Sequence, residues 1–206
     1  MTGCRPEVAM RLLKLLLILF VCAAAVLATV VVMLGPYEDA KAAYNKGDYA
    51  AVRRLLSSFI LALAGNSDAQ HNLGVMYDNG QGVTQDYAAA MSWYRKAAEQ
   101  DDAYAQTNLG FMYANGRGVP QDYVQAVSWF RKAAEQGDAY AQTNLGVMYY
   151  SGRGVPQDYV QAHMWWSLAA AKGDADAINN LDQIAAKMTP AQIAEAQKLA
   201  REWKPK

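Results

Sequence analysis

Residues Asp138 to Gly173 read DAYAQTNLGVMYYSGRGVPQDYVQAHMWWSLAAAKG, and almost the same sequence stands immediately before them. The preceding 36 residues, 102–137, are identical at 26 of 36 positions, which excludes a chance match. A more divergent copy occupies 66–101, and a degenerate closing copy occupies 174–206. A fixed period of this length is typical of proteins built from stacked structural repeats.

Each copy is predicted to form two antiparallel helices. Asp102 is a good N-cap, and the apolar residues after it recur at spacings of three and four. Gly116 ends this first helix, and Pro120 prevents its continuation. Asp122 then caps a second helix, which Gly137 terminates because glycine tolerates a left-handed backbone. One such hairpin cannot bury its own apolar faces, so the stack is the folding unit.

Two glycines interrupt the first helices of their copies, at Gly110 and Gly146. Glycine inside a helix costs about 1 kcal/mol relative to alanine. Its recurrence at equivalent positions predicts that another helix approaches closely there.

The ends of the stack are predicted to be atypical. Residues 36–65 are expected to form a leading hairpin, with its turn at Gly47. Residues 174–206 are expected to form a degenerate capping hairpin. Its last helix starts at Thr189, with proline next and Gln192 placed for a capping box. The predicted fold class is therefore all-α, an α-solenoid of antiparallel helix pairs.

The repeat also resembles a known family, the Sel1-like repeat, a relative of the tetratricopeptide repeat. The residues that carry the resemblance are Ala141, Asn144, Leu145, Gly146, Met148, Tyr149, Gly152, Arg153, Gly154, Val155, Pro156, Asp158, Tyr159, Ala162, Trp165, Ala169 and Ala170. The resemblance implies a solenoid that serves as an interaction scaffold, often in exported or envelope-associated bacterial proteins. Some cysteine-rich relatives are described as β-lactamases or penicillin binders. The two cysteines of this chain, Cys4 and Cys22, precede the repeats, so that activity is not carried over.

A separate apolar segment lies near the start of the chain. Residues 15–34 contain only one polar side chain, Thr29, and as a helix they would span about 30 Å, the thickness of a bilayer core. Residues 1–14 carry three basic side chains and one acid, and the positive-inside rule keeps such a flank in the cytoplasm. The sequence thus predicts a single-pass protein of the bacterial inner membrane, with its repeats in the periplasm.

Two other interpretations of this segment remain open. Small residues at 23–25 and 26–28 are acceptable to a signal peptidase, and cleavage there would release the repeats into the periplasm. The residues before Cys22 also resemble a lipid-attachment motif, although loosely. All three interpretations place the repeats on the far side of the membrane.

Composition and motifs speak against several function classes. The chain has 19 basic and 19 acidic residues without a basic cluster, so nucleic-acid binding is not expected. Its two histidines, His71 and His163, occupy different positions of the repeat and have no companion ligand nearby. We therefore expect no metal site, no cofactor and no catalytic activity.

A partner-binding groove is the better candidate for a functional site. In tetratricopeptide-like stacks the first helices line a concave face, and the equivalent positions here carry aromatic and small polar residues with few charges. Such a groove suits a peptide held by apolar anchors. The predicted partner-binding residues are Tyr104, Thr107, Phe111, Asn115, Tyr140, Thr143, Val147 and Tyr150, and His71, Val75, Asp78, Asn79, Ala114 and Ser151 occupy further inward positions.

Two functions remain open for this groove. The first is a membrane-anchored scaffold that binds a protein or peptide partner. The alternative is an envelope hydrolase or a cell-wall or carbohydrate-binding protein that uses the same groove. The same aromatic residues are also compatible with simple packing between repeats, because packing and groove positions differ only by a rotation about the helix axis.

Overall fold

The structure is a computed structural model that describes residues 39, 42–43 and 45–206. The chain divides into two compact units, residues 1–56 and 57–206, and the second contains all of the repeats. The predicted membrane segment, 15–34, lies outside the described residues. Within the described residues, no helix has both the length and the apolar character needed to cross a membrane.

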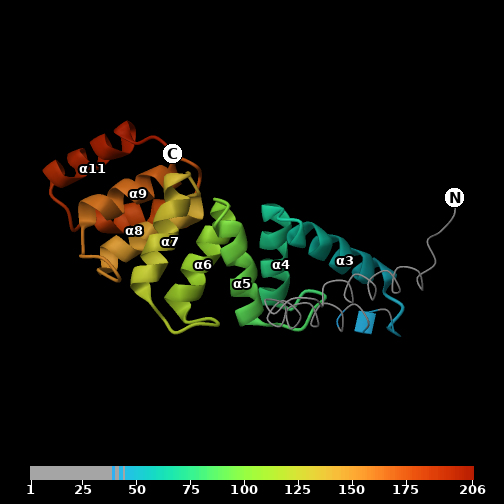
Figure 1. The fold of residues 1–206 in the computed structure, drawn as a ribbon. Helices are drawn as coiled ribbons and strands as arrows, with labels where there is room; N and C mark the ends of the chain where they lie inside the picture. The colour runs from blue at the N-terminus through green and yellow to red at the C-terminus, as the bar shows by residue number, and fades with distance from the viewer. Residues whose placement is uncertain (1–38, 40–41, 44) are drawn as a thin grey trace. The chain divides into compact units, whose positions relative to one another are not determined.

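Every regular element of the described part is an α-helix, as predicted (Figure 1). The helix α3 (Tyr49–Leu63) comes first, after Asp48, whose carboxylate accepts a hydrogen bond from the backbone N–H of Ala51 at 2.9 Å. Three hairpins follow, and their helices are α4 (Ser67–Asn79) with α5 (Tyr87–Ala98), α6 (Ala103–Asn115) with α7 (Tyr123–Glu135), and α8 (Ala139–Ser151) with α9 (Tyr159–Ala170). The chain closes with α10 (Ala175–Ala185) and α11 (Pro190–Glu202).

The repeats build two layers of helices. We call α4, α6, α8 and α10 the A layer, and α5, α7 and α9 the B layer. The helices α6 and α8 each pack against the B helix of their own repeat and against the B helix of the repeat before it, whereas α4 packs against α5 and α10 packs against α9. In the closing segment, α10 and α11 both pack against α9 rather than mainly against each other.

The two layers are spaced differently. Successive A helices contact one another, α4 with α6 and α6 with α8, whereas no comparable contact joins successive B helices of the described chain. The A layer is therefore the more closely spaced side of the stack.

The helix ends confirm the predicted caps. The Asp102 carboxylate accepts a hydrogen bond from the backbone N–H of Ala105 at 2.8 Å, and the Asp122 carboxylate accepts one from Val124 at 2.9 Å. Gly116 ends α6 in the left-handed region with φ 66°. The last helix, α11, begins with the complete capping box of Thr189. Local sequence signals thus determine where the helices start and stop.

The close approach predicted at the helix glycines is also confirmed. A Cβ atom added to Gly110 would lie 2.5 Å from ring atoms of Phe130, and one added to Gly146 would lie 2.5 Å from the indole of Trp166. That indole donates a hydrogen bond to the carbonyl oxygen of Thr143 at 3.0 Å. Each missing side chain makes room for the large aromatic residue of the paired helix.

Consecutive repeats are joined by buried glutamines that the apolar pattern did not reveal. The amide of Gln106 donates to the carbonyl oxygen of Ala98 at 3.2 Å, and its own oxygen accepts a hydrogen bond from Gln136 at 2.9 Å. Gln142 repeats the first of these bonds with the carbonyl of Ala134. These bonds satisfy both polar ends of the Gln106 side chain, which the stacking of the repeats removes from water, whereas the oxygen of Gln142 has no partner among the described residues.

Backbone also meets backbone at the repeat junctions. Gly118 and Gly154 have φ values of 71° and 72°, and a Cβ atom on Gly154 would overlap the backbone carbonyl of Tyr123 in the preceding repeat. The equivalent glycine of the first copy, Gly82, also has a positive φ of 73°, but a Cβ atom there would meet nothing within 4 Å. Gly82 and Gly154 therefore share a backbone conformation, but only Gly154 is in close contact with the preceding repeat.

Candidate partner-binding face

The most exposed of the predicted binding residues are two tyrosines at equivalent places of neighbouring repeats. Tyr104 is the second residue of α6 and Tyr140 is the second residue of α8, and each is 67% exposed. Large aromatic side chains are usually buried, so exposure of this extent at two equivalent positions is informative. In the first and last A helices the same position holds Asp68 and Asp176.

The other predicted aromatic residues take part in packing. Phe111 is half-buried and meets Phe130 edge to face, with ring centroids 5.3 Å apart. Tyr150 is half-buried beside Trp166, and the ammonium group of Lys187 lies over its ring at 4.6 Å and donates a hydrogen bond to its hydroxyl. Val147 is half-buried as well.

Both predicted threonines are buried, and the hydroxyl of Thr107 lies at the junction between repeats. Thr107 is 6% exposed and Thr143 is 7% exposed. The hydroxyl oxygen of Thr107 lies 2.9 Å from the carbonyl oxygen of Ala103 and 3.1 Å from the carboxylate of Asp138, the N-cap of the next repeat. Asn115 is exposed, but its amide donates to the carbonyl of Phe111 at 2.9 Å, one turn earlier. We leave both threonines out of the accessible surface.

One turn beyond the exposed tyrosines, an asparagine recurs in every A helix. Asn108 and Asn144 are half-buried, and residues four apart lie on the same face of a helix. The repeated Asn-Leu-Gly sequence contained this signal, but the predicted groove positions passed over it. We call the surface formed by the second and sixth residues of the A helices the A face. Its residues are Asp68, Asn72, Tyr104, Asn108, Tyr140, Asn144, Asp176 and Asn180.

His71 lies beside the first tyrosine of the A face. Its ring centroid is 6.0 Å from that of Tyr104, and its Nε2 atom is 3.1 Å from the side-chain amide nitrogen of Asn108. Burial lowers the pKa of His71, while the carboxylates of Asp102 and Asp68 act in the opposite direction. A neutral imidazole can accept the hydrogen bond of the asparagine amide, so the ring helps to fix the Asn108 side chain.

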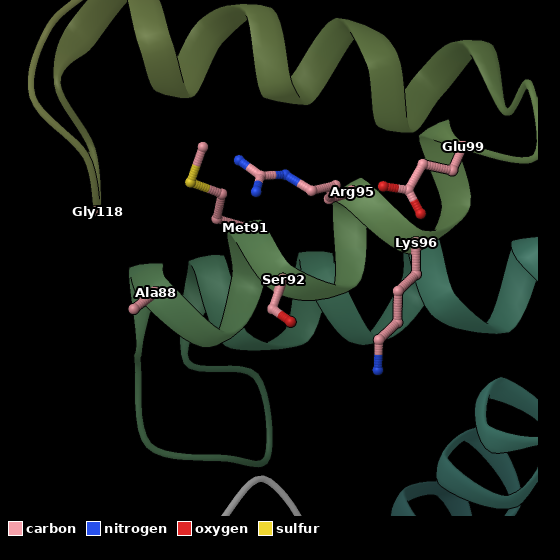
Figure 2. A pocket seen from close by; sticks show the side chains of 7 residues that line it. All are labelled: Ala88, Met91, Ser92, Arg95, Lys96, Glu99 and Gly118. Atoms are coloured by element: carbon pink, nitrogen blue, oxygen red, sulfur yellow. The ribbon is translucent and has the colours of Figure 1, made fainter. Parts of the chain in front are cut away.

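A second type of surface lies between a B helix and the loop that leads into the next B helix, and it was not predicted. A pocket of about 330 Å³ is lined by α5 with its C-cap Glu99 and by Gly118, which lies in the loop between α6 and α7. Figure 2 shows the side chains that line this pocket. An equivalent pocket of about 300 Å³ lies one repeat later. Their lining residues correspond one to one, Ala88, Met91, Ser92, Arg95, Lys96, Glu99 and Gly118 in the first and Val124, Val127, Ser128, Arg131, Lys132, Glu135 and Gly154 in the second, where Val155 adds to the lining.

The cations of these B-layer pockets interact with other side chains of the same chain. Arg95 donates a hydrogen bond to the hydroxyl of Tyr113 at 3.0 Å, and the ammonium group of Lys96 lies 4.1 Å from the ring centroid of Trp93. The second pocket repeats both interactions. Its acid, Glu135, forms a 2.8 Å ion pair with Lys206. Because the four cations and Glu135 already have partners within the chain, we regard the A face as the better binding surface.

The second histidine, His163, is buried in the B layer. His163 is 7% exposed, and its Nδ1 atom lies 3.2 Å from the hydroxyl oxygen of Ser167, so it is a packing residue of α9. Burial lowers its pKa. In the part of the chain that the structure describes, no group of three histidine, cysteine, aspartate or glutamate side chains is arranged to hold a metal ion.

Comparisons with known proteins agree with this architecture. The model of the Sel1 repeat family matches residues 67–102, 103–138 and 139–174, each one residue later than the copies delimited from the sequence. The chain is similar to a Sel1 repeat protein from Oxalobacter formigenes of known crystal structure, with 40% sequence identity and a TM-score of 0.59, over 64% of this chain and 98% of that chain.

A second solved structure is a protective antigen present in uropathogenic Escherichia coli strains, which displays an SLR fold. It is 35% identical, with a TM-score of 0.49, over 69% of this chain and 38% of that one. No match was found among curated proteins.

The matched repeats account for 108 of the 206 residues, from 67 to 174. Sel1 repeat proteins are generally scaffolds for protein–protein interaction. On the strength of its three matched repeats and its helical stack, the chain belongs to the Sel1 repeat family.

Proposed function

We propose that this chain is a membrane-anchored scaffold that binds a protein partner on its A face. The observation that carries the proposal is the pair of exposed rings at Tyr104 and Tyr140, one repeat apart and each 67% exposed. Tyrosine is enriched at protein interfaces because it combines a large apolar ring with a polar hydroxyl group.

The fold itself does not require aromatic rings at this position. The equivalent residues of α4 and α10 are Asp68 and Asp176, and both helices form without a tyrosine there. Tyr104 and Tyr140 also bury little of their surface within the repeats. A role outside the fold, in contact with a partner, accounts for rings that contribute little to packing.

The membrane anchor is a further part of the proposal. It is supported by the length of the apolar segment 15–34 and by the basic flank before it, and it places the repeats in the periplasm. A reporter enzyme fused after Lys206 tests this topology. We expect activity from a reporter that functions only in the periplasm, and activity from a reporter that functions only in the cytoplasm would contradict it.

The alternative function, an envelope hydrolase or a carbohydrate-binding protein, has weaker support. A hydrolase of this kind needs two cooperating carboxylates or an activated nucleophile close together. The exposed acids of the A face, Asp68 and Asp176, lie on the first and the last A helix, with α6 and α8 between them. A sugar polymer that stacks on the two tyrosines is the form of this alternative that needs no such pair.

Affinity capture with matched variants tests the scaffold function. The full-length chain is captured from detergent extracts in three forms, the wild type, a Tyr104→Ala/Tyr140→Ala double variant and a Val124→Ala control. Val124 is 64% exposed but lies on α7 in the B layer. We expect one protein to be recovered with the wild type and the control and to be lost with the double variant. Equal recovery with all three forms would contradict binding at the A face.

A further inference from the structure

The charges of the repeats are divided between the two layers. The helices of the A layer contain four acids, Asp68, Asp78, Asp176 and Asp182, and neither lysine nor arginine. The cations of the repeat helices lie in the B layer instead, at Arg95, Lys96, Arg131 and Lys132. A partner that approaches the A layer therefore meets acidic side chains on helices that carry no cation.

Some of the acids in this region already have partners. Asp78 has a side chain that is 18% exposed, and it lies 3.8 Å from the guanidinium of Arg117. The N-cap carboxylates of Asp102, Asp138 and Asp174 accept backbone hydrogen bonds and offset the partial positive charge of the helix ends. The exposed carboxylates that remain on the A face are those of Asp68 and Asp176, one on each side of the tyrosine pair.

Elsewhere in the described chain, aromatic rings are commonly covered by a cation of the chain itself. The pairs are Lys96 over Trp93 at 4.1 Å, Lys132 over Trp129 at 4.3 Å, Lys187 over Tyr150 at 4.6 Å, Arg153 over Tyr123 at 5.4 Å and Arg117 over Tyr87 at 5.6 Å. No cation of the described residues covers Tyr104 or Tyr140 in this way, although both rings are far more exposed than Trp93. An incoming lysine or arginine would find two exposed rings that carry no cation of the described chain, with the His71 ring beside that of Tyr104.

We propose that the segment bound on the A face is an extended, basic peptide. Two of its lysine or arginine side chains lie over the rings of Tyr104 and Tyr140, and the cations before and after them pair with Asp68 and Asp176. This inference rests on the proposed scaffold function and specifies the chemistry of the partner. The attraction is electrostatic in each of the four places, so it favours a cationic partner over an acidic one.

The spacing of the cations follows from the geometry of the stack. Neighbouring packed helices lie about 8–10 Å apart, and an extended peptide advances about 3.3 Å per residue. One repeat therefore corresponds to about three residues of the peptide. A basic residue at every third position would bring one cation to each of the four A helices.

Peptide binding to the full-length chain in micelles of an uncharged detergent tests the inference. The probe is a fluorescein-labelled peptide of four consecutive Arg-Ser-Gly triplets, and its affinity is measured by fluorescence anisotropy at several salt concentrations. Two reference peptides complete the set. One has the same composition with its arginines in a single run, and the other has glutamate in place of arginine.

Three variants identify the contacts. Loss of both rings in Tyr104→Ala/Tyr140→Ala should weaken binding of the spaced arginine peptide by about 5- to 30-fold, the factor expected for two exposed cation–π contacts. Asp68→Asn/Asp176→Asn should weaken binding at low salt and reduce its salt dependence. Val124→Ala, on the opposite layer, should leave the affinity unchanged. All of these side chains are exposed, and a circular dichroism spectrum like that of the wild type shows that each variant is folded.

The outcomes separate this inference from the proposed function. The inference is overturned if the glutamate peptide binds as tightly as the spaced arginine peptide, if the run of arginines binds equally well, or if the double tyrosine variant binds like the wild type. If these peptides fail while capture of a protein still depends on the two tyrosines, the scaffold function stands and the basic character of the partner is wrong. If capture is also independent of the tyrosines, both proposals fail.

Discussion

The loss of stability caused by Gly154→Ala measures how closely one repeat packs against the next. Gly154 has φ 72°, and an added Cβ atom would overlap the backbone carbonyl of Tyr123. A backbone atom cannot rotate away as the end of a side chain can, so the two repeats would have to separate locally. Gly82→Ala is the matched control, because Gly82 has nearly the same φ and nothing within 4 Å of the added atom.

The magnitude has two parts. The left-handed conformation costs about 1–2 kcal/mol for alanine, and both variants share this cost. Overpacking a tight contact typically adds about 1–3 kcal/mol, and only Gly154→Ala carries it. For a unit of this size, each kcal/mol corresponds to about 2–4 °C in Tm. Gly118→Ala should be intermediate, since its added atom would lie 2.8 Å from the carbonyl oxygen of Tyr87.

The assay is urea denaturation of the full-length chain, followed by circular dichroism at 222 nm. We expect the free energy of unfolding to decrease in the order wild type, Gly82→Ala, Gly118→Ala and Gly154→Ala. Loss of stability that is equal for Gly82→Ala and Gly154→Ala, within about 0.5 kcal/mol, would refute the argument. Backbone strain alone would then account for the loss of stability in both variants, and the inferred close contact between repeats at Gly154 would be wrong.

Three further predictions concern stability. Lys172→Gln should stabilise the chain by about 1 kcal/mol in urea denaturation, because the buried Gln142 oxygen has no partner in the described structure and glutamine occupies the matching position, 136, one repeat earlier. The substitution removes the hydrogen bond from the Lys172 ammonium group to the carbonyl of Gly137, but that bond is exposed and water can replace it. A loss of stability would contradict this prediction. Burial lowers the pKa of His163, so the folded state disfavours protonation of the imidazole. The stability of the wild type should therefore fall relative to that of His163→Val as the pH drops below about 6.5, with no such trend above about pH 7.5. Parallel stability–pH curves for the two proteins would contradict this prediction. Thr189→Ala should cost about 1 kcal/mol through loss of the capping box, and an unchanged Tm would show that α11 is held by packing alone.

The sequence was sufficient to predict the helices, their caps and the stacked arrangement. Caps such as Asp102 and stops such as Gly116 are local signals, and they recur in each copy. The glycine at 110 was also interpretable, because a residue that disfavours helix is retained only where space is needed. Each of these features depends on residues that lie within one repeat.

The accessible face was harder to predict, for a physical reason. Thr107 and Tyr104 lie in the same turn of α6, yet one is 6% exposed and the other 67% exposed. Which of them faces a neighbour depends on the rotation and tilt between repeats, which a single repeat does not specify. The buried Gln106 escaped notice because a binary apolar pattern assigns polar residues to the surface. The B-layer pockets likewise arise from spacing between repeats.

Site-specific photo-cross-linking in cells tests most directly the claim that a protein binds on the A face. A photoreactive phenylalanine analogue is placed in the full-length chain at Tyr104, at Tyr140 or at Val124, all of which are exposed. We predict that the same protein is cross-linked from positions 104 and 140 and not from position 124. Cross-linking from position 124 alone, or from none of the three, would contradict the account.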